Sequence, residues 1–302
     1  MPELPDIELY LHALREHVVG QRLEGVRLKS PFLLRTVEPT PDSLVGRTLL
    51  EVSRLGKRIV FDFGDEQFAV LHLMVAGRLQ WKPPGAAINQ RMGLLAFDFE
   101  TGALLLTEAS KKKRARLHIV SGRAALADHD PGGAEPLELS QDAFIERLTQ
   151  ENHTVKRALT DPRIFSGIGN AYSDEILFDA QLPPTRWTSR LDDDALIRLY
   201  ASTQKILSQW AEHLIAETGT DWPSKVTAFR PDMAVHGRFG EPCIRCGEKV
   251  QRIRFADNET NYCARCQNDG KLLADRSLSR LLKGDWPKTL EQLEQMKRER
   301  TE

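Results

Sequence analysis

Cysteine is missing from most of this 302-residue chain: all four cysteines lie between positions 243 and 266. No cysteine is left to form a disulfide with the rest of the chain, which favours a reducing compartment and a metal site over a disulfide framework. Long apolar runs are missing too, since no stretch could span a bilayer or form the core of a signal peptide. We therefore expect a cytoplasmic protein without membrane contact.

A large net charge of either sign is the third absence. The chain has 42 basic and 43 acidic residues, with a pI of about 6.7. This balance excludes a basic footprint over the whole chain, so any contact with a phosphate backbone must come from a local patch. One candidate is the run Lys111-Lys112-Lys113-Arg114, with Arg116 close behind. Such a run is usually a solvated loop, but in a near-neutral protein it is where a phosphate backbone would settle.

The first residues, Met1-Pro2-Glu3, offer a nucleophile of another kind. If Met1 is removed, Pro2 carries a secondary amine, and α-amino groups titrate at roughly 7.7–8.0. Attack on an aldehyde carbon would give an iminium ion, an electron sink like a lysine Schiff base. Glu3 adds a carboxyl group beside the amine. A helix is expected from Pro5 to Gly20, because apolar residues recur at helical spacing and glycine favours a helix end.

Short β runs separated by turn residues follow between Val26 and Val120. Several alternate with a period of two, as Ile59, Phe61 and Phe63 do. The expected strands are Leu50–Leu55, Lys57–Phe63, Phe68–Leu73, Leu95–Phe99, Ala103–Thr107 and Arg116–Val120. No long helical segment interrupts them, so the pattern predicts a β-sandwich preceded by one helix.

Helical periodicity dominates after a turn-rich linker at 128–136. The expected helices are Gln141–Gln150, His153–Thr160, Asn170–Ala180 and Asp192–Thr218, followed by a loop at Asp221–Asp232. The chain is thus expected to be an α+β protein with four parts. These are 1–130 (helix and β-sandwich), 131–234 (helical), 235–270 (metal-binding hairpin) and 271–302 (C-terminal extension).

The spacing of the cysteines is the strongest signal. Cys243 and Cys246 form one pair, and Cys263 and Cys266 form another after sixteen residues. Two such pairs predict a closed tetrahedral site for one Zn²⁺ per chain, which is structural because no coordination position is open. The intervening residues, 249–262, should form a β-hairpin. Zinc binding would supply folding energy to a segment too small for its own core.

A second motif, Gly167-Ile-Gly169-Asn170, lies where a helix begins. Two glycines let a backbone approach closely, and the helix N-terminus offers free N–H groups to an anion such as phosphate. An ordinary turn between helices is the alternative reading. Lys57 and His72 carry no signal when each is taken alone.

These pieces occur together, in this order, in one family. The chain resembles the formamidopyrimidine-DNA glycosylase / endonuclease VIII family of base-excision repair enzymes over about residues 1–270. The Pro2-Glu-Leu-Pro5 start and the Gly237-Arg-x-Gly-Glu-Pro-Cys243 run resemble the formamidopyrimidine branch more closely. The resemblance implies a helix-two-turns-helix domain around Gly167–Asn170 and a C-terminal zinc ribbon hairpin.

The resemblance also implies a function: a monomeric, bifunctional DNA glycosylase and AP lyase that excises oxidised bases from damaged DNA in the bacterial nucleoid, without a small-molecule cofactor. Pro2 would attack C1′ of the damaged nucleotide, Glu3 would act as acid and base, and Lys57 would hold a phosphate. Loss of the base through an iminium would be followed by β- and δ-elimination. The implied DNA contacts are His72 and the phosphate backbone, Met74 and the gap left by the flipped base, and Lys156 and Asn170 with phosphates around the lesion.

Three segments depart from the family pattern. The family usually has Asp-Pro-Arg-Arg-Phe-Gly, with an Arg and a Phe that wedge into the opposite strand, where this chain has Glu108-Ala-Ser-Lys-Lys-Lys-Arg114. The zinc hairpin usually carries a phosphate-binding Arg where this chain has Asn258. We predict that Arg252 and Arg254, two apart and so on one face of a strand, replace that contact. The loop Asp221–Asp232, which covers 8-oxoguanine in the formamidopyrimidine branch, also has an unfamiliar sequence.

Two alternative functions remain open from the sequence. One is a non-catalytic damaged-DNA-binding zinc protein with the same fold, which the altered wedge and hairpin favour and the Pro2-Glu3-Lys57 set opposes. The other is a zinc-ribbon transcription or RNA-binding factor, in which Pro2 would have no role. Borohydride trapping on abasic DNA separates both from the glycosylase, because only an amine that forms a Schiff base is trapped.

Overall fold

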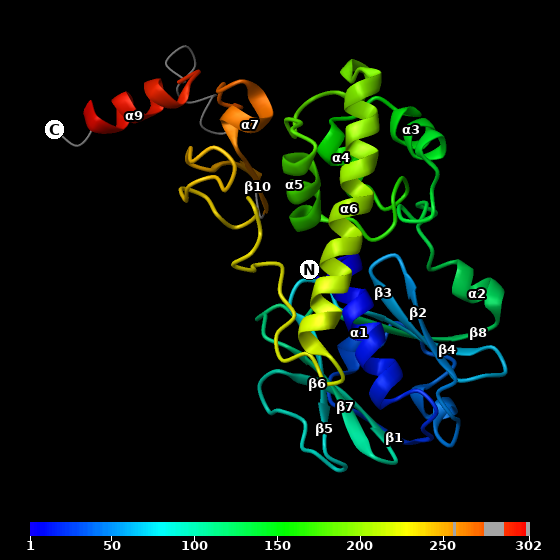
Figure 1. Ribbon diagram of the computed structural model, residues 1–302. Coiled ribbons are helices and arrows are strands. Elements are labelled where there is room, and N and C mark those ends of the chain that lie inside the picture. The colour runs from blue at the N-terminus through cyan, green and yellow to red at the C-terminus, as the bar shows by residue number, and fades with distance from the viewer. Residues whose placement is uncertain (256–257, 275–286, 300–302) are drawn as a thin grey trace. The chain divides into compact units, whose positions relative to one another are not determined.

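The computed structural model describes residues 1–255, 258–274 and 287–299 (Figure 1). The chain forms two compact units. Unit one contains residues 1–133 and 209–228, and unit two contains residues 134–208 and the chain from 229 onward. Residues 209–228 come well after the expected linker at 128–136 in the sequence, but they belong to unit one. The domain boundaries at 130, 234 and 270 stay a prediction.

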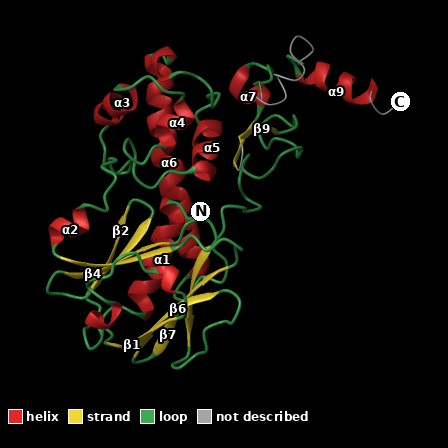
Figure 2. Ribbon diagram, turned by 180° about the vertical axis from the view of Figure 1, so that it is seen from behind, coloured by secondary structure: helices red, strands yellow, loops and turns green. Residues whose placement is uncertain are grey.

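Unit one is built around two antiparallel sheets of four strands (Figure 2). The first has the order β1-β6-β7-β5, with β1 at Leu23–Leu28, β6 at Gly93–Phe99, β7 at Gly102–Glu108 and β5 at Gly77–Lys82. The second has the order β2-β3-β4-β8, with β2 at Glu51–Leu55, β3 at Arg58–Asp62, β4 at Gln67–His72 and β8 at Arg116–Ser121. Short helical segments also occur in this unit: η1 at Pro31–Leu33, η2 at Pro41–Leu44 and α2 at Arg123–Ala127.

One hydrophobic core joins the two sheets and helix α1 (Leu4–His17). Inward residues alternate along the strands, as Ile59 and Phe61 do on β3 and Leu95, Phe97 and Phe99 on β6. The expected sandwich with one preceding helix is confirmed. Strands β1 and β5 were not among the predicted runs, because Gly25 and Gly77 and the polar residues of these strands weaken the apolar alternation.

The start of α1 is fixed by its own residues. Glu3 occupies the N-cap position with an extended backbone, and its N–H donates to Asp6 Oδ2 at 3.0 Å, one half of a capping box. Pro5 lies in the first turn, where a missing N–H costs nothing. The helix is also tied to β2, because Arg54 Nε donates to Glu8 Oε1 at 2.9 Å. Pro2 and Glu3 are therefore held at one end of a helix that is embedded in the core.

The loop after residue 218 packs in unit one. The Trp222 indole N–H donates to the Leu79 carbonyl at 3.1 Å, and its ring lies 6.3 Å from Tyr10 and 6.4 Å from Trp81. Val226 is buried in the same core. The expected loop at Asp221–Asp232 therefore has no regular structure, but its first half is anchored rather than free.

Unit two is mainly helical. It contains α3 (Gln141–Thr149), α4 (Val155–Thr160), η3 (Thr188–Arg190), α5 (Asn170–Asp179) and the first part of α6 (Asp193–Thr218). Phe144 and Phe165 stack at 4.6 Å in its core. These helices match the expected ranges to within two residues. No described helix is long and apolar enough to cross a membrane.

A hairpin follows in unit two, with β9 at Gln251–Phe255, β10 at Asn258–Tyr262 and helix α7 at Ala264–Asn268. The C-terminal extension adds α9 (Leu290–Glu299), a helix that the sequence analysis did not predict. Leu272, Leu273 and Leu290 of the extension pack against Ile253 and Tyr262 of the hairpin. The apolar residues Leu278, Leu281 and Leu282 lie outside the described residues.

Gly77 closes the turn that presents Met74, and we predict that this position tolerates no side chain. A Cβ there would lie 2.3 Å from the Leu73 carbonyl oxygen. Gly77→Ala should lower the free energy of unfolding by about 1–3 kcal/mol, as overpacking does, measured by chemical denaturation. Gly25→Ala on β1 is the control, since nothing lies within 4 Å of its Cβ. Equal stability of the two variants would contradict this account of the turn.

Candidate active site and zinc centre

The candidate nucleophile and its acid lie at the buried entry to α1. Pro2 is buried, and Glu3 is only 2% exposed. Burial lowers the pKa of the Met1 amine below its usual value, and nearby Arg78 and Lys57 lower it further, whereas Glu3 and Asp6 act in the opposite direction. An amine at this end of the chain is thus easier to deprotonate than a solvated one.

Lys57 belongs to the same group of charges. It follows Gly56, whose φ of +62° makes the turn between β2 and β3. Burial lowers the pKa of Lys57, and the Glu3 carboxylate opposes that shift. The structure therefore brings Pro2, Glu3 and Lys57 into one electrostatic neighbourhood, although they come from different elements of unit one.

His72 and Met74 lie at the end of β4. Met74 has a φ of +53°, and its N–H donates to His72 Nδ1 at 3.0 Å. Burial, followed by Arg58, Lys57 and Arg116, lowers the pKa of His72 to about 4. The imidazole is thus neutral at pH 7, and because Nδ1 accepts a hydrogen bond, Nε2 carries the proton. His72 can donate one hydrogen bond to a phosphate without a positive charge.

A buried carboxylate fixes the lysine-rich loop at 109–114. Glu108 is 1% exposed and accepts hydrogen bonds from the Arg114 N–H at 2.9 Å and the Ala115 N–H at 3.1 Å. Lys113 Nζ donates to the Glu108 carbonyl. Lys111, Lys112 and Arg114 remain exposed. The loop therefore has a fixed base and an exposed cationic tip.

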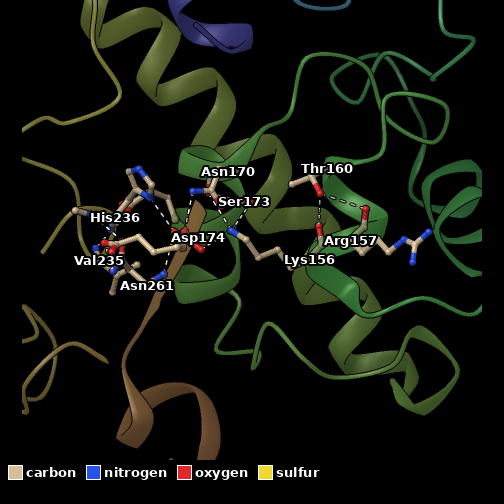
Figure 3. A network of polar contacts seen from close by, with 12 residues as sticks. Lys156, Arg157, Thr160, Asn170, Ser173, Asp174, Val235, His236 and Asn261 are labelled. Atoms are coloured by element: carbon tan, nitrogen blue, oxygen red, sulfur yellow. Dashed lines mark hydrogen bonds and ion pairs between the residues drawn. The ribbon is translucent and has the colours of Figure 1, made fainter. Parts of the chain in front are cut away.

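In unit two, Lys156 is held within the helical domain rather than directed freely into solvent. Its ammonium group donates to three acceptors: Asn170 O at 3.0 Å, Ser173 Oγ at 2.8 Å and Asp174 Oδ1 at 2.5 Å (Figure 3). The side chain is 13% exposed. All three ammonium protons are engaged, so a direct phosphate contact would require one of these bonds to be exchanged.

Asp174 connects Lys156 to the zinc hairpin. Its other oxygen accepts from His236 Nδ1 at 2.8 Å and from the Asn261 N–H at 3.1 Å (Figure 3). The neighbouring Glu175 accepts three backbone N–H groups, from residues 234, 235 and 236, at 2.7–2.9 Å. Burial raises the pKa of Glu175, and these three bonds oppose the shift. The two consecutive acids of α5 thus attach residues 234–236 and strand β10 to the helix.

Asn170, the first residue of α5, also touches the hairpin, because its side-chain amide donates to the Glu259 carbonyl at 2.8 Å. This contact fixes the amide at the N-terminus of α5, where free N–H groups gather. The helix start and the hairpin are consequently one rigid surface within unit two.

The hairpin register places Arg252 and Arg254 on one face, as the spacing predicted. Arg254 lies opposite Glu259 and Arg252 opposite Asn261, whereas Asn258 lies opposite Phe255 and so on the other face. The Arg252 guanidinium is 4.0 Å from the Phe239 ring centre and 3.3 Å from Glu259 Oε2. Asn258 and the two arginines therefore cannot contact a phosphate from the same side of the hairpin.

The four cysteines meet at one point. Their Sγ atoms all lie within 4.8 Å of one another, with 3.4 Å between Cys246 and Cys263 and 3.9 Å between Cys243 and Cys266. Tetrahedral Zn–S bonds of about 2.3 Å would place the sulfurs about 3.8 Å apart. Backbone N–H groups of Arg245 and Cys266 point at Cys243 and Cys263 sulfurs. The donor set fits one four-coordinate zinc ion.

Sequence reasoning missed the residues that position these groups. Asp174 and Glu175 are consecutive acids in a helix that is otherwise buried, and this pairing was a usable signal. Glu108 carried no signal of its own, because its partners depend on how the loop folds. Unit one holds Pro2, Glu3, Lys57, His72, Met74 and Lys111–Arg114, and unit two holds Lys156, Asn170, Arg252, Arg254, Asn258 and the cysteines.

Three family models match the chain in this order. A formamidopyrimidine-DNA glycosylase N-terminal domain matches residues 1–131, a formamidopyrimidine-DNA glycosylase H2TH domain matches 133–218, and a zinc finger found in FPG and IleRS matches 240–268. The last match and the cysteine geometry agree. Cys243, Cys246, Cys263 and Cys266 are the ligands of a structural zinc ion.

Known proteins match over most of their length. The formamidopyrimidine-DNA glycosylase of Heliobacterium modesticaldum is 30% identical, and that of Variovorax paradoxus 31% identical, over 88% of this chain and 100% of each relative. Among solved structures, Lactococcus lactis Fpg with abasic-site DNA has a TM-score of 0.76 at 25% identity over 88% of this chain and 99% of that one. MutM in complex with carbocyclic 8-oxo-G DNA has the same score and identity, over 88% of this chain and 100% of that one.

Removal of zinc should unfold the hairpin selectively. Without the metal the cysteines lose their cross-link, and β10 then loses its hold on Asp174. Hydrogen exchange after chelation should show reduced protection in β9, β10 and the start of α5, while β2, β3, β4 and β8 stay protected. DNA affinity should fall in parallel.

Cys263→Ser provides the matching test without a chelator, and it should give the same exchange pattern. An equal decrease of protection in the sandwich strands would show that the two units do not have separate cores.

Proposed function

This chain belongs to the formamidopyrimidine-DNA glycosylase family, and we propose that the amine of Pro2, once Met1 is removed, is its catalytic nucleophile. The protein is a base-excision repair DNA glycosylase with AP lyase activity, and damaged DNA is its partner. The observation that supports the nucleophile is the buried entry to α1, where Pro2 lies beside Glu3 and where burial lowers the pKa of the Met1 amine against the opposing charges of Glu3 and Asp6. Solved neighbours contain 8-oxo-G or Fapy-dG DNA, which supports oxidised bases as the substrates.

The first chemical step would be attack of the Pro2 nitrogen on C1′ of the damaged nucleotide. The base departs with the glycosidic electron pair, and opening of the sugar leaves an iminium between Pro2 and C1′. Glu3, buried beside the amine, would deliver and remove the protons that these changes require. The zinc ion has four protein ligands, so it serves the fold rather than this step.

The iminium then makes strand cleavage possible. Its positive charge acidifies the C2′ proton, so removal of that proton expels the 3′ phosphate, and a second elimination expels the 5′ phosphate. Lys57 would hold a phosphate during these steps. Its ammonium group interacts electrostatically with Glu3, so it lies near the proposed site of the reaction. Hydrolysis would finally release Pro2.

DNA would be bound by both units. In unit one, His72 would donate its Nε2–H to a phosphate, and the exposed tip at Lys111–Arg114 would supply positive charge. Met74, which lies on a turn with a positive φ, would fill the gap left by a flipped base. In unit two, we propose that the N-terminus of α5 with Asn170 and Lys156 accepts phosphates. Asn258 and the pair Arg252 and Arg254 would bind DNA phosphates from opposite faces of the hairpin. One chain supplies both sets, which supports a monomer. We propose that it acts in the cytoplasm at the nucleoid.

The nucleophile can be tested by borohydride trapping on abasic DNA. An N-terminal extension ahead of Pro2, or Pro2→Gly, should remove or sharply reduce the trapped complex, because no secondary amine is then free. Protease removal of the same extension should restore it, which controls for folding. Undiminished strand cleavage with the blocked N-terminus would refute the assignment.

Glu3→Gln gives a matched comparison within this experiment. It should impair excision of a damaged base more than cleavage of a preformed abasic site, because the latter has no departing base to protonate.

The arginine pair has its own test. Arg252→Gln with Arg254→Gln should weaken binding to all duplex sequences alike and lower the slope of log affinity against log salt by about 0.9 for each phosphate that an arginine no longer binds. Lys249→Ala with Arg265→Ala removes the same charge from the same zinc module and should leave the slope nearer the wild-type value. If the arginine variant keeps its affinity and slope, the hairpin does not bind DNA through this face.

A further inference from the structure

Two arginines and a neutral histidine form a row across the second sheet of unit one. The strand register pairs Arg58 of β3 with His72 of β4, and His72 with Arg116 of β8. Directly paired residues of antiparallel strands point to the same face, so these three side chains lie side by side. Arg58 is part of no DNA contact proposed above, and Arg116 enters only as the last residue of the basic run that begins at Lys111.

This row lies on the outer face of the sheet. The inner face carries Ile59, Leu71 and Leu117, which belong to the core of the sandwich. On the outer face, Val60, Phe68, Val70 and Val120 are covered by Ala125 and Leu126 of α2. The cover ends before the row begins: Arg116 is exposed, and Arg58 and His72 are half-buried.

The two arginines of the row are not neutralised by a direct acidic partner within the described part of the chain. Neither Arg58 nor Arg116 forms an ion pair or a side-chain hydrogen bond with another described residue. Each arginine affects its neighbours. Burial and Arg116 lower the pKa of Arg58. His118 lies next to the row, and burial, His129 and then the two arginines lower its pKa to about 4. The acid that acts on Arg58 is Asp130, and burial and Arg116 outweigh it.

A third cation, Arg35, extends the row. The Arg35 N–H donates to the Leu117 carbonyl at 2.9 Å, so the chain at 34–35 runs along the free edge of β8. Arg35 is exposed and also lowers the pKa of His118. Like charges held this close repel one another, which an ordinary solvated surface avoids by mixing acids among them.

We propose that Arg58 and Arg116 bind consecutive phosphates of the DNA on either side of the phosphate contacted by His72. The proposal rests on the proposed role of His72 in phosphate contact. Strands lie about 4.8 Å apart, so the row is about 10 Å long, whereas three consecutive phosphates of one DNA strand span two steps, or about 7 Å of rise, a difference that long arginine side chains can cover. Arginine provides the forked donors that phosphate oxygens accept, and His72 donates one neutral hydrogen bond between them.

The experiment is a salt titration of binding to undamaged duplex DNA. Arg58→Gln with Arg116→Gln should lower the slope of log affinity against log salt by about 1.8, two phosphates at about 0.9 each. Between 50 and 200 mM salt the affinity of the variant should therefore fall by about tenfold less than that of the wild type. Arg58→Lys with Arg116→Lys keeps the charges and should keep most of the slope, which separates charge from misfolding.

The control is Arg22→Ala with Arg123→Ala, which removes two positive charges from elsewhere in unit one. An unchanged slope in the glutamine variant, or an equal drop in the control pair, would overturn the proposal. Binding to undamaged DNA needs no chemistry, so this result does not depend on Pro2. Failure of borohydride trapping would instead count against the nucleophile alone.

Discussion

The carboxylate of Asp174 is the interaction on which unit two depends. It is 1% exposed and is shared by an ammonium group, an imidazole and a backbone N–H from three separate segments. A buried charge is stable only when its oxygens are fully satisfied, so loss of any one partner leaves an unpaired charge in the interior. Helix α5, the segment at 234–236 and the zinc hairpin are therefore held in one arrangement. The zinc ion and Asp174 both hold the end of the hairpin where Gln251 pairs with Tyr262, because Asn261, which donates to Asp174, is two residues from Cys263.

Buried carboxylates that accept backbone N–H groups also occur in unit one. Glu3 and Asp6 cap the helix that carries the candidate nucleophile, and Glu108 holds the base of the lysine-rich loop. Among the described residues, the buried carboxylates are those of Glu3, Asp6, Glu108, Asp174 and Glu175, and no lysine or arginine is fully buried. Acids thus organise the interior and bases remain on the surface. This division explains how a chain with a net charge of −1 can present cationic surfaces to DNA.

Most of the fold could be predicted from local sequence patterns. Period-two alternation predicted six of the strands, helical spacing predicted the long helices, and the cysteine spacing predicted the zinc site, because each is set by neighbours in sequence. What could not be predicted depends on contacts far along the chain. Asp174 meets His236 and Asn261 across 62 and 87 residues. The alignment of Arg58, His72 and Arg116 follows from strand register, which no single run contains. Helix α9 was missed because its apolar residues are few and it follows a polar segment.

The departures from the family pattern can be understood through charge density. Outside the row of Arg58, His72 and Arg116, three cationic groups of the proposed DNA surface each contact a carboxylate: Glu108 in the lysine-rich loop, Asp174 beside Lys156 and Glu259 beside Arg252 of the hairpin. A carboxylate in that position fixes geometry and also subtracts charge, so each group attracts phosphate less strongly than its basic residues alone would suggest. Weak attraction at many places favours binding that is released easily from undamaged duplex. Tight binding then has to come from contacts made only around a flipped base, where the nucleophile lies.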